Sequence, residues 1–453
     1  ITEDLKEQHP MSRLLEGDVG SGKTAVAAAS VYGVVTSAPH SQPQTAYMVP
    51  TEILAKQQFT SFIEFFEHLP IQIGLVTGSG CKKFPSKVDP TAATDVSRTQ
   101  LLKWLADGSV QVLVGTHALI QKSVVFKNLA YVIIDEQHRF GVSQRRALMR
   151  RTTQAVSPAG ESSNLLRSSA QQVGVPHLLS MTATPIPRTL ALTVYGDLDI
   201  SVLDEKPPGR KEINTQVVPP SKRDEVYRAI RSELASGRQA YVICPRIEEP
   251  DPNKALALRV RSVKQECKRL QKDSFKDYTV DMLHGKQLPK EKEEVMQKFS
   301  DNEIQILVAT SVVEVGVNVP NATVIIIEGA ERFGLAQLHQ LRGRVIRSNH
   351  QAYCYVFSES KTVKTAERLK ALKTAKNGFE LAEFDLGIRG SGELYGKRQS
   401  GLSDIAMEAM KNLKLVEAAR EEAKKIVEKD DELKNHPAIA EIIERKTKDI
   451  HFE

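Results

Sequence analysis

Short apolar runs of five or six residues alternate along the chain with longer segments in which apolar residues recur every three or four positions. The short runs, bounded by polar residues, predict buried β-strands, and the longer segments predict amphipathic helices. Regular alternation of the two predicts a parallel, doubly wound α/β sheet. In the first part of the chain the predicted strands are 45–49, 71–76, 110–115, 131–135 and 177–181, with a predicted helix at 53–66.

A second alternation of the same kind follows Pro207-Pro208-Gly209, a tripeptide typical of a linker. Beyond residue 359 the strand pattern ends, and two charged helices are predicted at 361–376 and 404–428. Between them the glycine-dense segment 387–392 predicts a loop. The predicted strands of this second alternation are 239–244, 279–283, 305–309, 323–328 and 352–357, and its predicted helices are 223–236, 255–271 and 290–299.

We therefore predict an α/β protein of three parts. Residues 1–205 form a first α/β domain, which is interrupted by irregular surface insertions at 78–97 and 152–175. Residues 206–358 form a second domain of similar plan, and residues 359–453 form a helical module.

Composition narrows the class of protein. The chain has 453 residues, of which 41% are hydrophobic, as in ordinary globular proteins, and its net charge of +6 is compatible with nucleic acid without requiring it. No apolar run is long enough to predict a membrane span, and no signal peptide is visible. Because the chain starts at Ile1 rather than at Met, we expect further sequence upstream. The four cysteines have no C-x-x-C spacing, so neither a zinc site nor a disulfide framework is predicted: Cys81, Cys244, Cys267 and Cys354.

Residues 17–24, which we call the phosphate loop, lie between a short apolar segment and an alanine-rich run. A strand, a glycine loop and a helix form the context in which the pattern G-x-x-x-x-G-K-[ST] cradles a polyphosphate through its backbone N–H groups. In such a loop Lys23 reaches the β- and γ-phosphates, and the Thr24 hydroxyl ligates Mg²⁺. We expect ATP to be bound by Gly17, Asp18, Val19, Gly20, Ser21, Gly22, Lys23 and Thr24.

Two carboxylates, Asp135 and Glu136, end an apolar strand about one hundred residues after the phosphate loop. Taken alone they are equally consistent with a solvated acidic turn. Behind a phosphate loop they predict that Asp135 holds Mg²⁺ and that Glu136 orients and deprotonates the attacking water.

A third motif lies at 340–347 and reads Gln-Leu-Arg-Gly-Arg-Val-Ile-Arg. Gln340, Arg344 and Arg347 would share one face of a helix, from which two arginines can reach a γ-phosphate across a cleft. Arginine suits this role because its fork is always charged and matches phosphate geometry. A solvated basic helix face is the alternative explanation.

These motifs resemble those of the second helicase superfamily. Asp-Glu-Gln-His at 135–138 resembles its D-E-x-H box, Met-Thr-Ala-Thr-Pro at 181–185 its S/T-A-T motif, and 340–347 its Q-x-x-G-R-x-x-R motif. From about residue 10 to 402, outside the two insertions, the chain resembles the RecG family. Three features favour RecG over the transcription-repair coupling translocases: Ser21, the residue after Pro50-Thr51, and Asp-Glu-Gln-His in the acidic box. The longer stretches that carry this resemblance are 15–24, 50–55, 115–120, 135–142 and 181–195.

The resemblance implies two RecA-like parallel-sheet domains with an ATP cleft between them, followed by a helical hairpin at about 360–384 and a translocation loop at 385–401. The chain departs from the family at Ile346, where Gly is normal, and at Ser311, where Thr is usual, so reduced hydrolysis is expected if Ile346 shifts the aim of the arginines. The resemblance implies catalytic roles for Lys23, Glu136, Gln340, Arg344 and Arg347. It places Asn318 at the ATP cleft. It also implies DNA contact or coupling for Thr51, Glu52, Thr116, His117, Thr182, Thr184, His284, Thr310, Arg368, Arg389 and Gln399.

The function implied by the resemblance is that of an ATP- and Mg²⁺-dependent double-stranded DNA translocase and helicase of the 3′–5′ type, which remodels stalled forks and Holliday junctions in recombination and repair. We expect a monomer that binds branched or duplex DNA, with a single-stranded DNA-binding protein as a further candidate partner and no membrane association. It would act in a bacterial cytoplasm with the nucleoid or in a DNA-containing organelle. With sixteen residues before the phosphate loop, we expect the family's amino-terminal wedge domain to be absent.

Three alternatives remain open at this point. The first is a coupling-type translocase that displaces a bound protein, the second is a DNA-binding remnant with impaired ATPase activity, and the third is an RNA helicase.

Overall fold

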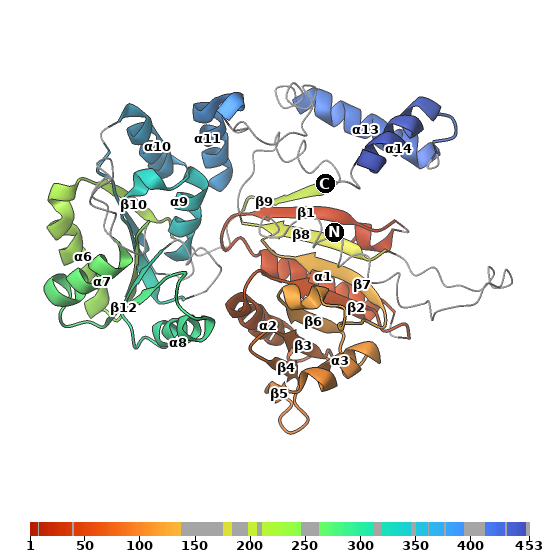
Figure 1. Ribbon diagram of the computed structural model, residues 1–453, viewed down its shortest axis with the longest axis horizontal. Coiled ribbons are helices and arrows are strands. Elements are labelled where there is room, and N and C mark those ends of the chain that lie inside the picture. Colours follow the sequence, from red (N-terminus) through yellow and green to blue (C-terminus); the bar gives the residue numbers. More distant parts are fainter. Residues whose placement is uncertain are drawn as a thin grey trace. The chain divides into compact units, whose positions relative to one another are not determined.

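The computed structural model of the chain contains a mostly parallel sheet and a second, parallel sheet, each flanked by helices (Figure 1). Its contacts divide it into two compact units, Ile1–Pro185 with Ser201–Asp385, and Ile186–Ile200 with Leu386–Glu453. Apart from the start of one edge strand, both sheets belong to the first unit. The division into three domains at 205 and 358 stays a prediction. The structure describes residues 1–7, 9–38, 40–136, 175–183, 198–205, 211–245, 262–310, 319–345, 350–360, 362–375, 377–393, 413–430 and 433–449.

The first sheet has nine strands in the order β5-β4-β3-β6-β2-β7-β8-β1-β9. Its central strands pair in parallel, and the amino-terminal core packs α1 (Lys23–Ser37) and α2 (Glu52–Phe66) against them. All five predicted strands of this part are present. The strands are β1 (Ser12–Gly17), β2 (Gln44–Met48), β3 (Ile73–Val76), β4 (Cys81–Phe84), β5 (Thr94–Val96), β6 (Val112–Gly115), β7 (Leu129–Ile134), β8 (His177–Thr182) and β9 (Asp199–Leu203), and α3 is Arg98–Ala106.

The segment 78–97 corrects one expectation. Instead of an irregular surface insertion it contributes β4 and β5, which pair antiparallel with β3 and with each other at the edge of the sheet. Phe84 and Cys81 are buried, so the segment shares the core despite its polar composition. The segment forms strands because β4 pairs with β3, and the composition of the segment alone does not reveal this pairing. The other expected insertion, 152–175, lies outside the described residues except for Val175.

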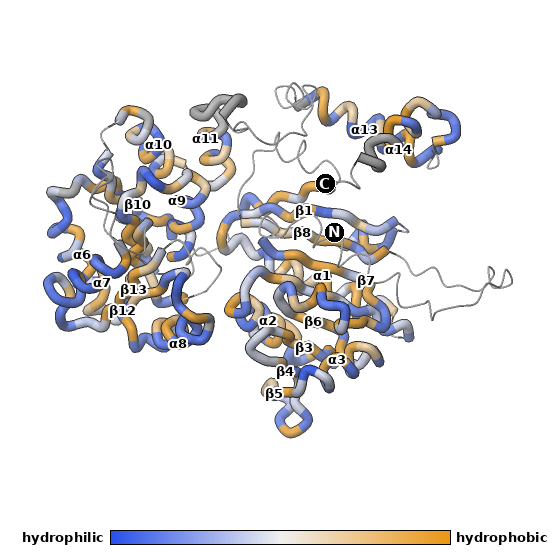
Figure 2. The backbone as a smooth tube through the Cα atoms, viewed as in Figure 1, coloured by the Kyte–Doolittle hydropathy of each residue, from blue (hydrophilic) through white to orange (hydrophobic). Residues whose placement is uncertain are grey.

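The second sheet has six strands, all paired in parallel, in the order β10-β15-β14-β11-β13-β12. Along β11 (Gln239–Ile243), Tyr241 and Ile243 belong to one core, while Ala240 and Val242 belong to the other. The strand is therefore buried on both faces, which explains its continuous apolar run. Figure 2 shows the neighbouring strand β13 as hydrophobic as well. The remaining strands are β10 (Asn214–Val218), β12 (Val280–Leu283), β13 (Ile306–Ala309), β14 (Ala322–Ile327) and β15 (Tyr353–Phe357), and the helices are α6 (Arg223–Ala235), α7 (Val263–Arg269), α8 (Pro289–Ser300) and α9 (Leu335–Arg342).

Two helices follow the second sheet, α10 (Val363–Thr374) and α11 (Gly378–Glu393). The second of them corrects the expected loop, because the glycine-dense residues 387–392 are helical. Each glycine costs helix stability by roughly 1 kcal/mol relative to alanine, but extending a helix that has already nucleated is far less costly than starting one. The well-formed turns from Gly378 onward therefore carry the helix through the glycines.

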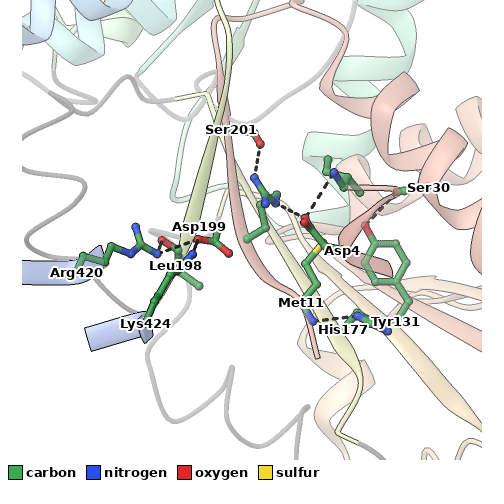
Figure 3. Close-up of polar contacts among 12 residues, drawn as sticks. Asp4, Met11, Ser30, Tyr131, His177, Leu198, Asp199, Ser201, Arg420 and Lys424 are labelled. Atoms are coloured by element: carbon green, nitrogen blue, oxygen red, sulfur yellow. Dashed lines mark hydrogen bonds and ion pairs between the residues drawn. The ribbon is translucent and has the colours of Figure 1, made fainter. Parts of the chain in front are cut away.

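The second unit contains α13 (Leu413–Lys429) and α14 (Pro437–Asp449). Arg420 donates hydrogen bonds to the Leu198 carbonyl at 2.6 Å and to Asp199 Oδ1 at 3.1 Å, and Lys424 donates to the same carboxylate at 3.0 Å (Figure 3). These contacts tie α13 to the short chain segment 198–200. Among the described helices none is long and apolar enough to cross a membrane.

Candidate nucleotide site

The phosphate loop follows β1 and leads directly into α1, as the sequence predicts. Gly22, which precedes the helix, has a φ of 96°, a left-handed conformation that glycine adopts without strain. Lys23 Nζ donates to the carbonyl oxygens of Gly17 at 2.7 Å and Asp18 at 2.9 Å. The ammonium group therefore lies over the loop, where a bound polyphosphate would meet it.

Asp135 and Glu136 follow β7 at the same end of the sheet. Asp135 is 9% exposed, and its Oδ2 accepts hydrogen bonds from Tyr47 Oη at 3.3 Å and Gln58 Nε2 at 3.4 Å. Burial, followed by the neighbouring Glu136 charge, raises the pKa of Asp135 to about 7, against the opposing effect of Lys23. A buried carboxyl whose ionised form is disfavoured is a group that a divalent cation would hold in its charged state.

A cavity of about 380 Å³ joins these groups. Its wall combines the loop residues Lys23 and Thr24 with Asp135 and Glu136, and it also includes Arg344 from the second sheet's domain. Arg344 is 4% exposed and Gln340 is 8% exposed, so neither belongs to a solvated basic face. The other residues of the wall are Val19, Gly20, Gly22, Ala25, Leu54, Gln57, Gln58, Ser61, Phe65 and Ala183.

The segment that carries Arg344 touches the phosphate loop directly. His339 Nε2 lies 2.5 Å from Asp18 Oδ1, and Gly343 packs against Val19. Burial alone would raise the pKa of Asp18, but the hydrogen bonds from the His339 ring and from the Val19 N–H lower it to about 2. Sequence reasoning missed His339, although it directly precedes Gln340 in the motif, and it also missed Tyr47 and Gln58, which carry no motif signal.

Four of the residues expected to contact DNA have local side-chain partners, namely Thr51, Glu52, Thr116 and Arg368. Thr51 caps α2 by accepting from Leu54 N at 3.4 Å, and Glu52 accepts from Gly78 N at 2.9 Å. Thr116 caps the short helix His117–Ile120, in which the His117 side chain is exposed. Thr182, His284 and Thr310 are buried at strand ends, and Arg368 Nη2 donates to the Phe333 carbonyl at 2.5 Å. Contact with DNA stays a prediction for this set.

Several expected site residues cannot be placed. Thr184, Asn318, Arg347 and Gln399 lie outside the described residues, as do Ile346, Ser311 and the Gln-His half of the acidic box. Arg389 belongs to α11 by its backbone, and its side chain is not described.

Three family models match successive parts of the chain. They are the DEAD/DEAH box helicase family at residues 3–193, the helicase conserved C-terminal domain at 221–349, and domain 3 of the ATP-dependent DNA helicase RecG at 375–452. The order agrees with the two sheets and the helices that follow them.

Individual relatives agree with the family models. The chain is 45% identical to the ATP-dependent DNA helicase RecG of Bacillus subtilis over 432 residues, covering 95% of this chain and 57% of that protein. It is 42% identical to the RecG helicase of Synechocystis over 438 residues, covering 96% of this chain and 48% of that protein. The chain thus spans about half the length of the curated relatives it matches.

A solved structure of RecG bound to a three-way DNA junction matches 92% of this chain and 48% of its own chain, with a TM-score of 0.67 and 38% sequence identity. The match covers both RecA-like sheets, so the fold and the motif order lead to the same assignment. Over nearly its whole length the chain is therefore similar to the RecG family of ATP-dependent DNA helicases.

Proposed function

We propose that this chain is an ATP-hydrolysing motor that translocates on double-stranded DNA and remodels branched DNA. The observation that carries the proposal is the cavity in which Arg344 joins Lys23, Thr24 and the Asp135-Glu136 pair. Such a site needs two domains to be complete, so binding and hydrolysis of a nucleotide can drive closure and reopening. Relatives named as DNA helicases, and the RecG structure with a DNA junction, support DNA as the track.

The chemistry follows from the residues in the cavity. Lys23 neutralises the β- and γ-phosphates. Glu136 accepts a proton from a water molecule while the oxygen of that water bonds to the γ-phosphorus and the bond between the γ-phosphorus and ADP breaks. Arg344 stabilises the charge that builds on the transferred phosphoryl group. Mg²⁺, when bound by Asp135 and the Thr24 hydroxyl, would supply charge neutralisation at the phosphate oxygens. The buried carboxylate and the hydroxyl line the same cavity, so the donor set fits this ion.

The proposal extends to partners and place. We propose branched or duplex DNA as the substrate, a monomer as the working form, and a single-stranded DNA-binding protein as a further partner. The setting would be a bacterial cytoplasm with the nucleoid, or a DNA-containing organelle. Arg347, Arg389, Gln399, Asn318 and Thr184 keep the roles that the family resemblance implies for them.

The decisive experiment measures ATP hydrolysis with a three-way junction, linear duplex DNA, single-stranded DNA or RNA, with Mg²⁺ present. We expect the junction and the duplex to stimulate turnover, and Lys23→Ala and Glu136→Gln each to abolish the stimulation while DNA binding persists. Unchanged turnover in either variant would refute the assignment.

The same experiment separates the alternatives. Stimulation by RNA alone would indicate an RNA helicase. Tight DNA binding with a flat hydrolysis trace in the unmodified chain would indicate a DNA-binding remnant. Hydrolysis on duplex DNA that displaces a bound polymerase but leaves junctions intact would indicate a coupling-type translocase.

A further inference from the structure

An unbroken series of hydrogen bonds connects the phosphate loop to α10. Asp18 Oδ1 lies 2.5 Å from His339 Nε2, and His339 Nδ1 lies 3.0 Å from Arg342 Nη2. Arg342 Nη1 in turn donates to the Leu372 carbonyl oxygen at 2.7 Å. The series therefore joins the loop after β1, the helix α9 and the last turn of α10.

The chemistry of arginine decides which way these bonds run. A guanidinium group can only donate, so His339 Nδ1 must accept from Arg342. The ring proton then lies on Nε2, which donates it to the Asp18 carboxylate. Arg342 thus selects the neutral tautomer of His339 that can bind the phosphate loop.

The surroundings make these bonds strong. His339 is 1% exposed and Arg342 is 7% exposed, so water competes little for either side chain. The bond between His339 and Asp18 is assisted by the charge of the carboxylate. Arg342 also satisfies a terminal carbonyl of α10, where a positive charge complements the helix dipole.

Asp18 transmits this contact to the nucleotide site. Its side chain accepts from Val19 N at 2.8 Å, and its carbonyl accepts from Lys23 Nζ at 2.9 Å. A shift of Asp18 would therefore move both the loop backbone and the lysine that meets the phosphates. Arg344 lies two residues after Arg342, in the same segment as His339, which contacts Asp18.

We propose that His339 is a positioning residue of the nucleotide site. Held in its Nε2–H tautomer by Arg342, it clamps Asp18 and keeps the phosphate loop aligned with Arg344. This inference rests on the proposed function, because it concerns the same site. The bond between His339 and Asp18 also depends on the position of α10, because Arg342 contacts both His339 and α10.

The test compares two variants of the full chain. His339→Phe keeps the ring shape but cannot donate, and His339→Gln offers an amide N–H in place of Nε2–H. We expect His339→Phe to lower DNA-stimulated kcat/KM for ATP roughly tenfold to a hundredfold, the range for losing a hydrogen bond to a charged group. His339→Gln is expected to recover most of that loss, which a role in packing alone would not produce.

A double variant tests whether the effect runs through Asp18. The kcat/KM of the double variant Asp18→Asn with His339→Phe is expected to be no lower than that of the more damaging single variant. If the two single-variant losses in kcat/KM multiply instead, the proposal is overturned. His177→Ala is the control, because His177 Nδ1 also accepts an internal hydrogen bond, from Met11 N at 2.9 Å, at the far end of β8. It should leave kcat/KM unchanged. If His339→Phe does not fold, as judged by its thermal midpoint, Arg342→Lys takes its place, since one ammonium cannot serve both partners in the same geometry.

Titration with a fluorescent ATP analogue separates this inference from the proposed function. If the unmodified chain binds the analogue but hydrolyses no ATP, the proposed function fails and analogue affinity still decides the role of His339. Weaker binding by His339→Phe with recovery by His339→Gln supports the clamp. Equal affinity and equal kcat/KM in all three proteins overturn it.

Discussion

Gly343 lies against Val19 of the phosphate loop so closely that a Cβ at position 343 would come within 2.8 Å of both Val19 Cβ and Val19 Cγ2. Real Cβ atoms essentially never approach that closely. The segment that carries Arg344 therefore reaches the loop only because residue 343 has no side chain.

We expect Gly343→Ala to slow ATP turnover by roughly fivefold to 150-fold, because about 1–3 kcal/mol of overpacking strain would oppose the contact between the two segments. Steady-state hydrolysis measures the effect. Gly33→Ala is the matched control, since a Cβ there meets nothing within 4 Å in the middle of α1. That variant should keep full activity and gain about 0.5–1 kcal/mol of stability. Full activity in Gly343→Ala would show that the close approach is not needed for turnover.

Glu16, in the strand before the phosphate loop, provides a stability test that depends on pH. It is 1% exposed, and burial raises its pKa from 4.5 to about 7. Between these two values the folded chain binds more protons than the unfolded chain, so the free energy of unfolding falls as the pH rises. Glu16→Gln removes this penalty and should stabilise the protein at pH 8 by up to about 3 kcal/mol, at roughly 1.4 kcal/mol per pKa unit.

Denaturant unfolding of the Glu16→Gln variant at pH 4.5 and pH 8 checks this expectation. The gain should shrink to about 0.4 kcal/mol at the lower pH, where the carboxyl is protonated in the folded state and half protonated in the unfolded state. The exposed Glu64 serves as control, and Glu64→Gln should behave alike at both pH values. A gain of equal size at pH 4.5 and pH 8 would show that the effect is not one of ionisation.

Tyr47 should lower the pKa of Asp135, the carboxylate expected to hold Mg²⁺. Its hydroxyl donates to Asp135 and so favours the charged form, against the burial that raises the pKa of Asp135 to about 7. Tyr47→Phe would raise that pKa further, and the acidic limb of the pH–activity profile should move to higher pH by about half a unit to one unit. Tyr131→Phe, on the neighbouring strand β7, removes a buried hydroxyl that is hydrogen-bonded to Ser30 of α1, and its profile should not move. A shift common to both variants would point to general loosening of the core.

A buried ion pair secures the second sheet. Arg223 bonds both oxygens of Glu328, with Nη2 donating to Oε2 at 2.8 Å, and it also covers the Phe357 ring at 4.1 Å. The Glu328 side chain is 5% exposed and that of Arg223 is 15% exposed, so Glu328→Ala would leave a largely buried cation without its carboxylate partner. We expect a loss of about 3–5 kcal/mol in the free energy of unfolding, measured with denaturant. Lys425→Ala, which breaks an exposed pair with Glu422, should change it by less than about 0.5 kcal/mol. Similar losses in the two variants would contradict the importance of burial.

Local pattern was enough for the elements with a strong periodic signal. Strands such as β11 and β14 are continuous apolar runs because both faces of the sheet are covered, and helices such as α2 and α8 show the spacing of one buried face. The phosphate loop was predictable because its conformation is encoded within eight residues.

Pattern failed where the partner of a segment is distant in the chain. The strands β4 and β5 form because β3 offers an edge, and α11 continues through its glycines because a helix already precedes them.

The nucleotide site shows the same division. The amino-acid sequence alone was enough to predict which residues would carry phosphate chemistry, since Lys23, Asp135, Glu136 and Arg344 belong to recognisable short motifs. Only the tertiary structure decided that His339 bonds Asp18 and that Gly343 meets Val19, contacts between residues more than three hundred positions apart. The physical reason is that a motif records local backbone geometry and chemistry, whereas the alignment of two motifs depends on contacts between segments that are distant in the sequence.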